Sequence, residues 1–189
     1  MLGDVRVSVY RTQAETAMVL KYGRINEGHP LTVRVQSSCA YGEVFLSSAC
    51  DCREQLIETY RIFKERGSGV FIYLDQEGRG AGLADKARAY ELEQECGLDT
   101  VEAYRRLGIP VDRRTYGLAG QILVNLEISR VTLLTNNLRK LEDLRDCNLT
   151  VVREPLHPPI TNNNSSYLAT KQEKLGHLLN VAPKVPTLF

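Results

Sequence analysis

The chain has 189 residues, of which 43% are hydrophobic and 25% charged, a composition ordinary for a globular protein with a real core. Its 24 basic and 23 acidic side chains leave a formal net charge of +1, which argues against a broad footprint for DNA or RNA. No apolar run approaches the roughly 20 residues that span a bilayer, and the first residues lack the pattern of a signal peptide. We therefore expect a cytoplasmic protein that binds neither nucleic acid nor membrane.

The first half of the chain predicts three strands and one helix. Three segments alternate like strands or are continuously apolar: residues 5–10, 31–36 and 69–74. A turn-prone segment, residues 26–30, separates the first two strands. Residues 51–66 carry apolar side chains at helical spacing, and Gly67 follows where a helix commonly ends.

The second half predicts further helices that alternate with strands. Helical patterns occupy residues 83–96, 115–127, 138–145 and 166–179, and the segments 130–134 and 149–152 are typical of strands. This alternation indicates an α/β or α+β layered fold, with a mixed β-sheet flanked by helices. We expect a single catalytic domain over residues 1–180, and a flexible tail over residues 181–189 because that segment carries two prolines.

Three of the five cysteines have the spacing of a metal site. Cys39 is followed, after ten residues, by Cys50 and Cys52, which flank Asp51. Three protein ligands with water in the fourth position are the pattern of catalytic zinc, whereas structural zinc normally has four protein ligands. An odd number of cysteines in a chain without a signal peptide favours thiolates over disulfides. Three unrelated buried cysteines, or a structural site with one distant ligand, are the alternatives.

Polar segments at strand ends and helix starts suggest an anion site. Residues 77–82 form a glycine-rich stretch between a predicted strand and a predicted helix, where backbone N–H groups can approach a phosphate. Residues 112–115 precede another helix, and residues 135–140 close a strand with two nearby cations. Each segment alone fits an ordinary turn or helix cap. Their common position, however, is where ligands bind in open α/β sheets.

Together these residues resemble the GTP cyclohydrolase II family of riboflavin synthesis. The resemblance runs from about residue 34 to residue 179 and rests on the order and spacing of the cysteines and of five further segments: 76–79, 88–90, 99–103, 133–137 and 174–178. It implies a zinc-dependent hydrolase that opens the imidazole ring of GTP at C8, releases formate and pyrophosphate, and leaves a diaminopyrimidinone ribosyl phosphate. It also implies a homodimer and Mg²⁺ bound to the triphosphate.

The resemblance implies a role for each matched residue. Tyr90 matches a tyrosine that assists hydrolysis, Arg114 an arginine proposed to attack the α-phosphorus, and Asp112 its proton acceptor. Because a guanidinium is cationic at neutral pH, an electrostatic clamp on the phosphates is the rival role for Arg114. One zinc per chain would be held by Cys39, Cys50, Cys52 and a water. The implied substrate-binding residues are Arg34, Gln36, Ser37, Ser38, Gln55, Glu77, Gly78, Arg79, Thr100, Thr135 and Lys140.

The chain departs from the family pattern beside these residues. Gln36 and Ser38 stand where the family has histidine and glutamate, so an imidazole and a carboxylate are lost near the metal. Tyr104 replaces an asparagine and Thr115 an aspartate. Two alternatives follow. In the first, the chain is a paralogue that makes an altered product, such as a formamidopyrimidine, or that acts on another nucleotide. In the second, it is a catalytically dead nucleotide-binding protein.

Overall fold

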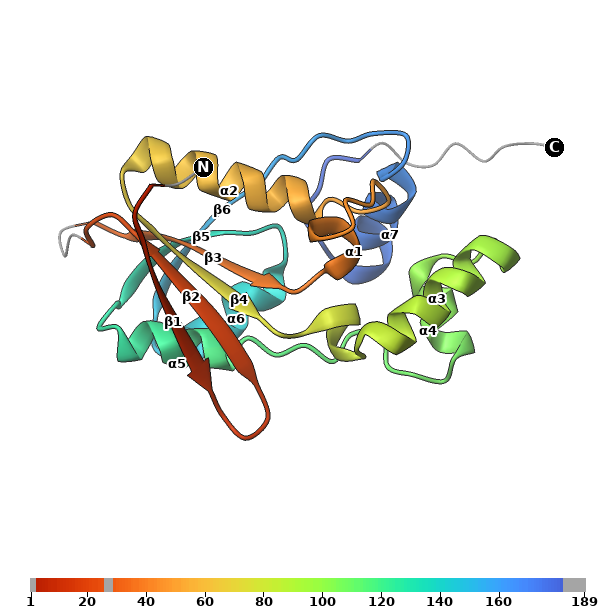
Figure 1. Cartoon of the computed structure of the whole chain (residues 1–189), viewed down its shortest axis with the longest axis horizontal. Helices are drawn as coiled ribbons and strands as arrows, with labels where there is room; N and C mark the ends of the chain where they lie inside the picture. Colours follow the sequence, from red (N-terminus) through yellow and green to blue (C-terminus); the bar gives the residue numbers. More distant parts are fainter. Residues whose placement is uncertain (1–2, 26–28, 182–189) are drawn as a thin grey trace.

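Six strands form one mixed sheet in the order β1-β2-β4-β3-β5-β6 (Figure 1). The computed structural model describes residues 3–25 and 29–181. The strands are β1 (Val5–Arg11), β2 (Thr16–Tyr22), β3 (Leu31–Ser37), β4 (Gly69–Leu74), β5 (Arg130–Leu134) and β6 (Thr150–Glu154). The β1–β2 hairpin joins β4 in antiparallel fashion, whereas β4, β3, β5 and β6 run parallel to one another. The predicted α/β fold with a mixed sheet is therefore confirmed.

Helices cover both faces of this sheet, and two more project beyond its end (Figure 1). The helices are α1 (Ala40–Glu43), α2 (Cys52–Arg66), α3 (Leu83–Cys96), α4 (Thr100–Arg106), α5 (Gly117–Asn125), α6 (Leu138–Arg145) and α7 (Ser165–Leu175). A short 3-10 turn, η1 (Glu77–Gly80), leads from β4 toward α3. The α3–α4 pair lies apart from the sheet, next to α7 and η1.

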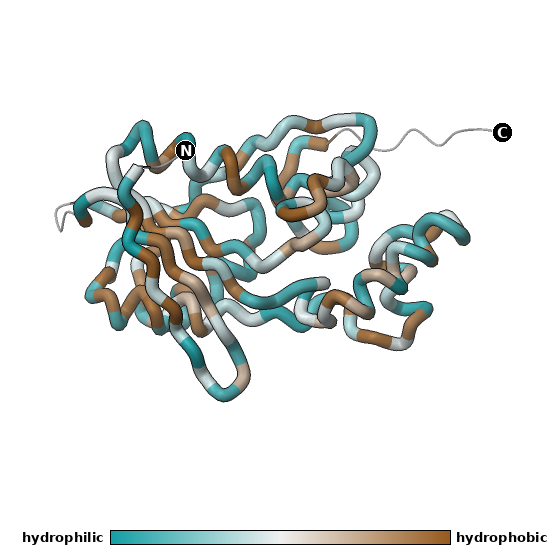
Figure 2. The backbone as a smooth tube through the Cα atoms, in the orientation of Figure 1, coloured by the Kyte–Doolittle hydropathy of each residue, from teal (hydrophilic) through white to brown (hydrophobic). Residues whose placement is uncertain are grey.

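Alternation along the central strands divides the core between the two faces. Val33 and Val35 of β3 pack on one face with the apolar sides of α5 and α6, while Phe71 of β4 packs on the other face against Phe63 of α2. Brown segments accordingly gather on the central strands of the sheet in Figure 2. Because side chains alternate, Arg34 lies between two buried valines yet belongs to the other face. The sheet thus carries a buried cation on the face that α2 covers.

Parallel strands bring three loops to one edge of the sheet. The segment after β3 contains Ser38 and Cys39, the segment after β4 contains Glu77, and the segment after β5 contains Thr135. All three strands end at the same edge because β4, β3 and β5 are parallel neighbours. This edge is where ligands of open α/β sheets bind.

The structure corrects several predicted boundaries and adds elements. The helix predicted over 115–127 spans Gly117–Asn125, and the helix predicted over 166–179 ends at Leu175 because Gly176 adopts the left-handed conformation. The strand predicted over 149–152 spans Thr150–Glu154. Strand β2 and helices α1 and α4 were not predicted. Residues 26–28 of the expected turn and 182–189 of the expected tail lie outside the described residues.

Candidate active site

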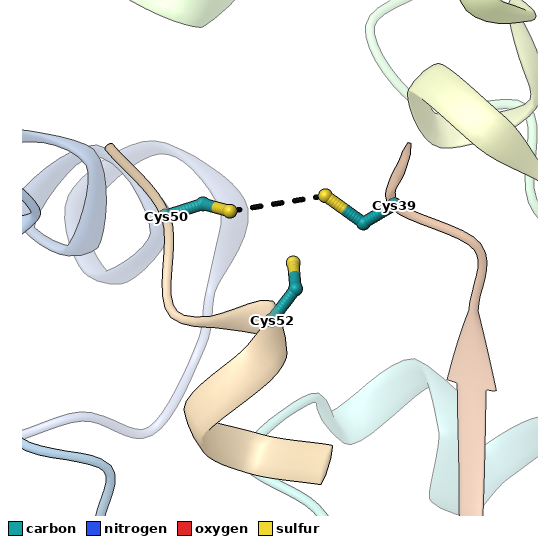
Figure 3. A group of neighbouring side chains, drawn as sticks. All are labelled: Cys39, Cys50 and Cys52. Atoms are coloured by element: carbon teal, nitrogen blue, oxygen red, sulfur yellow. Dashed lines mark hydrogen bonds between the residues drawn. The ribbon is translucent and has the colours of Figure 1, made fainter. Parts of the chain in front are cut away.

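The thiols of Cys39, Cys50 and Cys52 converge on one point (Figure 3). Cys39 follows β3, and the other two cysteines lie at the start of α2, so the parallel strand order brings them together. Their sulfur atoms all lie within 4.8 Å of one another, and the Cys39 and Cys50 Sγ atoms are 3.8 Å apart. Two sulfurs bound tetrahedrally to zinc at about 2.3 Å are about 3.8 Å apart. The three side chains therefore fit one zinc ion.

The cluster has an open side and a tight side. Among the described residues, no histidine, cysteine or carboxylate joins the three cysteines as a fourth ligand. Cys39 and Cys52 line a cavity, so the free corner of a tetrahedral ion would face a space for ligand. On another side Gly42 packs so closely that an added Cβ would lie 2.7 Å from the Cys50 Sγ atom. Only glycine fits there without moving the sulfur.

Lys86 of α3 contacts the sulfur cluster directly. Its Nζ lies 3.2 Å from the Cys39 Sγ atom and donates to Glu77 Oε1 at 2.6 Å. Burial lowers the pKa of Lys86, but the Cys39 and Glu77 charges more than offset this and raise the pKa above its usual range. Hydrogen bonds from Cys50 and Cys52, together with the Lys86 charge, lower the pKa of Cys39. The same sulfur contacts and burial raise the pKa of Cys50 and of Cys52, so the surroundings favour the thiolate form at Cys39.

A buried ion pair holds the Cys50–Cys52 turn in place. Asp51 is 0% exposed, and its Oδ1 atom accepts a hydrogen bond from Lys171 Nζ at 2.5 Å. Its other oxygen accepts from Gln55 Nε2 at 2.5 Å. Lys171 belongs to α7, so the pair links the metal-binding turn to a helix 120 residues away in the sequence. Neither Asp51 nor Lys171 was predicted to have this role.

Replacing Asp51 by alanine is expected to destabilise the fold by about 3–5 kcal/mol, because it leaves the Lys171 ammonium buried without its counter-ion. Denaturant unfolding in the presence of a chelator measures this effect without a contribution from metal loss. The matched control is Glu58→Ala, which breaks an exposed pair with Arg61 and should cost less than about 1 kcal/mol. Equal losses in the two variants would contradict the structural role of the buried pair.

Two adjoining cavities extend from the cysteines. The first has the sulfur cluster at its wall and is lined further by aromatic, glycine and polar residues from the end of β3, η1, α3 and α4: Ser37, Ser38, Glu77, Gly78, Arg79, Lys86, Tyr90, Glu93, Thr100 and Tyr104. The second is strongly cationic and lies at the ends of β3 and β5: Arg34, Gln36, Gln55, Thr135, Asn137, Lys140, Lys171 and His177. The residues that line both are Ser37, Cys52, Arg79, Arg114 and Tyr167.

The second cavity concentrates buried positive charge. Arg34 and Lys140 are only 4% and 6% exposed, and they donate to the backbone oxygens of Leu134 at 2.8 Å and Val35 at 2.7 Å. Burial lowers the pKa of Arg34 to about 10. Burial and the nearby Arg34 and Arg114 charges lower the pKa of Lys140 well below its usual range. A bound anion would relieve this repulsion, so the cavity suits a polyphosphate.

Arg79 points its charge between the two cavities without a hydrogen-bond acceptor. Its guanidinium lies 5.8 Å from the Tyr104 ring centre and 5.7 Å from that of Tyr167. The side chain is 8% exposed, and both terminal nitrogens are buried without a hydrogen-bond partner among the described residues. Its φ of 56° places the backbone in the left-handed region. Unsatisfied buried donors on a strained residue are the mark of a missing acceptor, such as a ligand oxygen.

Asp112 and Arg114 form a two-point ion pair at the boundary of the cavities. Arg114 Nε donates to Asp112 Oδ1 at 2.9 Å, and Nη2 donates to Oδ2 at 2.6 Å. The backbone N–H of Arg114 also donates to Oδ1 at 3.0 Å, so the Asp-x-Arg spacing closes a local turn. The carboxylate therefore fixes the direction of the guanidinium.

Tyr90 lies against the sulfur cluster with its ring stacked on Tyr41. The two ring centres are 4.9 Å apart and the planes differ by 11°. Burial, followed by the surrounding negative groups, raises the pKa of Tyr90 well above its ordinary range. The phenol is therefore a proton-bearing donor at neutral pH.

The structure brings the predicted site residues together. All of them line the two cavities except Cys50, which contacts Cys39, and Asp112, which contacts Arg114. Their individual roles stay predictions. Sequence reasoning missed Lys86, Glu93, Tyr167 and Lys171, and assigned no role to His177 although it lies in the matched segment 174–178. For Lys86 and Glu93 the usable signal was helical spacing from the matched Tyr90, which they precede by four residues and follow by three, respectively.

Comparison with known proteins decides the family. The family model described as GTP cyclohydrolase II matches residues 1–155. The chain belongs to the GTP cyclohydrolase II family. This confirms the predicted family and enzyme class, a GTP cyclohydrolase II-type hydrolase.

Curated relatives of this GTP cyclohydrolase II chain are larger proteins. The chain is 49% identical over 165 residues to "Riboflavin biosynthesis protein RibBA" of Bacillus cereus, covering 87% of the chain and 41% of that protein. It is 47% identical over 170 residues to the protein of the same name from Bacillus cytotoxicus, covering 89% and 42%. The chain thus spans less than half the length of these relatives.

Two further observations complete the comparison. A solved thioesterase domain from the curacin biosynthetic pathway aligns with 94% of the chain and 56% of its own length, at 11% identity and a TM-score of 0.34, too low to inform the fold.

Within the described residues of this GTP cyclohydrolase II family member, no helix combines the length and apolar character needed to cross a bilayer.

Proposed function

We propose that this chain is a zinc-dependent hydrolase that opens the imidazole ring of GTP at C8, releases formate and pyrophosphate, and leaves a diaminopyrimidinone ribosyl phosphate. The observation that carries the proposal is the junction of two unlike cavities. One has Cys39 and Cys52 of the sulfur cluster in its wall together with Tyr90, and the other is lined by buried cations. A nucleotide has a matching pair of parts, a base and a polyphosphate. The names of the Bacillus relatives support a place in riboflavin biosynthesis.

The sulfur cluster and its neighbours serve the ring-opening step. Zinc held by Cys39, Cys50 and Cys52 would supply hydroxide at neutral pH for attack on an electron-poor ring carbon. Lys86 holds the Cys39 sulfur by a contact of 3.2 Å. Tyr90, kept protonated by burial, donates a hydrogen bond toward the nitrogen that gains charge as the ring opens. Its stacking on Tyr41 fixes the direction of that donor.

The cationic cavity binds the triphosphate. Arg34 and Lys140 approach from β3 and α6, and Arg79 supplies the two unsatisfied donors. Charge-assisted hydrogen bonds to phosphate oxygens would satisfy these groups. We expect Mg²⁺ on the triphosphate, because it binds chiefly through phosphate oxygens and offsets the charge of the leaving pyrophosphate. The ion pair with Asp112 aims Arg114 at the same phosphates.

Replacing Lys140 by methionine is expected to raise the KM for GTP roughly tenfold to hundredfold, because one buried charge-assisted contact to phosphate is lost. Steady-state kinetics with saturating zinc and Mg²⁺ measures the change. The matched control is Arg139→Met, which removes an equal charge from the adjacent, exposed position and should leave KM within about twofold. An unchanged KM in the Lys140 variant would exclude this residue from phosphate binding.

The direct test is incubation of the purified, zinc-loaded protein with GTP and Mg²⁺, with formate and pyrophosphate assayed separately. Equal amounts of both products would support the complete reaction. Pyrophosphate without formate would mean that the formyl group stays on the product, which is the altered-product alternative. Binding of GTP with neither product would mean a catalytically dead nucleotide-binding protein. Sedimentation of the same sample tests the homodimer that the resemblance implies.

A further inference from the structure

One face of α3 forms a wall of the first cavity. Lys86, Ala89, Tyr90 and Glu93 all line it, at the i, i+3, i+4 and i+7 spacing of a helical stripe. Lys86 contacts the sulfur cluster, and Tyr90 lines the cavity beside it. Glu93 has no role in the ring-opening step or in triphosphate binding.

Glu93 marks the end of the cavity away from the sulfurs. Lys86 contacts the Cys39 Sγ atom at 3.2 Å. Glu93 follows seven residues later, and at 1.5 Å per residue this is about 10 Å along the helix axis. At its own end Glu93 faces the same cavity as Thr100, the first residue of α4, which lowers the pKa of the Glu93 carboxyl. The cavity thus has sulfur at one end and a carboxylate at the other.

Glu93 is the carboxylate of this cavity that has acceptor capacity to spare. The other carboxylate that lines it, Glu77, already accepts three hydrogen bonds and uses both oxygens: Oε1 accepts from Lys86 at 2.6 Å and Gly78 N at 3.0 Å, and Oε2 accepts from Ala40 N at 2.6 Å. Tyr104 beside Glu93 directs its hydroxyl to the Gly78 oxygen at 2.9 Å. A carboxylate offers about four acceptor sites, and Thr100 is the one neighbouring side chain whose hydrogen bonding affects the pKa of Glu93.

The environment of Glu93 is suited to a ligand with N–H donors. Burial raises the pKa of Glu93, while the Thr100 hydrogen bond and the Arg79 charge act in the opposite direction. Further donors from a ligand would offset the burial and favour the ionised form. In guanine, N1–H and the 2-amino group form two parallel donors on the edge opposite the imidazole carbon C8. With C8 at the sulfur end, that edge points toward Glu93.

We propose that the Glu93 carboxylate accepts hydrogen bonds from N1–H and the 2-amino group of guanine, and so selects guanine over purines that lack the 2-amino group. This inference rests on the proposed function of the same site. It assigns Glu93 to base specificity and separates it from the groups that perform the chemistry.

The test compares GTP with ITP, which has the same ring and triphosphate but no 2-amino group. The wild-type kcat/KM should favour GTP roughly tenfold to hundredfold, the range of one hydrogen bond to a charged group. Glu93→Leu should reduce this preference to about threefold or less, and Glu93→Gln, with a single acceptor oxygen, should give an intermediate preference. The matched control Glu91→Leu changes an exposed carboxylate of the same helix and should keep the wild-type preference.

The ratio of the kcat/KM values for GTP and ITP in one sample does not depend on the fraction of folded protein. A variant that is partly misfolded therefore cannot imitate a lost preference. Equilibrium titrations with GMP and IMP give the same comparison without turnover. If the wild-type protein releases no product from GTP, the proposed function fails, and the GMP-to-IMP preference still decides the role of Glu93. If GTP is turned over and Glu93→Leu keeps the wild-type preference, only the role of Glu93 is wrong.

Discussion

Replacing Cys52 by serine is expected to reduce bound zinc from one ion per chain to a small fraction and to lower ring opening of GTP by roughly a thousandfold or more. Cys52 lines both cavities, and its sulfur completes the three-ligand set. A serine hydroxyl does not ionise at neutral pH and is a poor zinc ligand. Loss of a metal that contributes several kcal/mol to the transition state corresponds to a rate effect of this size.

Metal analysis after dialysis, combined with formate release, measures both effects. The matched control is Cys96→Ser, because Cys96 is exposed at the end of α3 and lies outside the sulfur cluster. This variant should keep its zinc and its activity. Full activity of Cys52→Ser, or equal zinc loss in both variants, would contradict a catalytic zinc site at these three cysteines.

Patterns within a short stretch of sequence were sufficient to predict most of the helices and strands. Residues 69–74 form a continuous apolar run and residues 130–134 contain β-branched and leucine residues typical of strands, and both are strands with those bounds. Strand β2 was missed because Ala17 through Leu20 neither alternates strictly nor ends at a strong turn signal. Helix α4 was missed because seven residues are too few for a helical period, although Asp99 and Glu102 form a complete capping box at its start.

Contacts between distant segments could not be predicted in the same way. The spacing of Cys39, Cys50 and Cys52 pointed to metal because all three lie within one short stretch. The role of Lys171, by contrast, depends on Asp51, which lies 120 positions away in the sequence. The two residues meet only because α7, which carries Lys171, packs beside the Cys50–Cys52 turn. An isolated lysine in a helical pattern is most often solvated, so nothing in the local sequence distinguishes this one.

The departures from the family pattern acquire a physical meaning in the structure. Gln36 accepts from Arg34 Nε at 3.2 Å and donates to the Cys52 backbone oxygen at 3.2 Å. Ser38 accepts from the Gln76 backbone N–H at 3.1 Å. Both side chains therefore tie β3 and the loop after it to their surroundings by hydrogen bonds, without adding a charge of their own. Tyr104 similarly anchors η1 and covers the Arg79 guanidinium. Retained cysteines beside such replacements are compatible with a working site.

Replacing Arg114 by alanine is expected to lower kcat roughly hundredfold to thousandfold, the usual effect of removing one preorganised charge from a transition state. Arg113→Ala, at the exposed neighbouring position, is the matched control and should keep kcat within about twofold. Steady-state kinetics of pyrophosphate release measures both variants. Arg114→Lys should fall between the wild type and the alanine variant, since it keeps the charge but loses the fork that Asp112 orients.

The same variants distinguish two roles for Arg114: an electrostatic clamp on the phosphates, or a nucleophile that attacks phosphorus. Attack on phosphorus would require Arg114 to give up a proton. Burial lowers the pKa of Arg114, but Tyr116 and Asp112 outweigh it and leave the pKa above its ordinary value. Burial likewise raises the pKa of Asp112, and the Arg114 hydrogen bonds outweigh it and make this carboxylate a weaker base than usual. Both shifts oppose proton transfer between the two groups, so we expect Arg114 to act as a cation. Intact-protein mass spectrometry of a reaction quenched during turnover should then show no nucleotidyl adduct, and such an adduct, absent from Arg114→Ala, would establish the nucleophile instead.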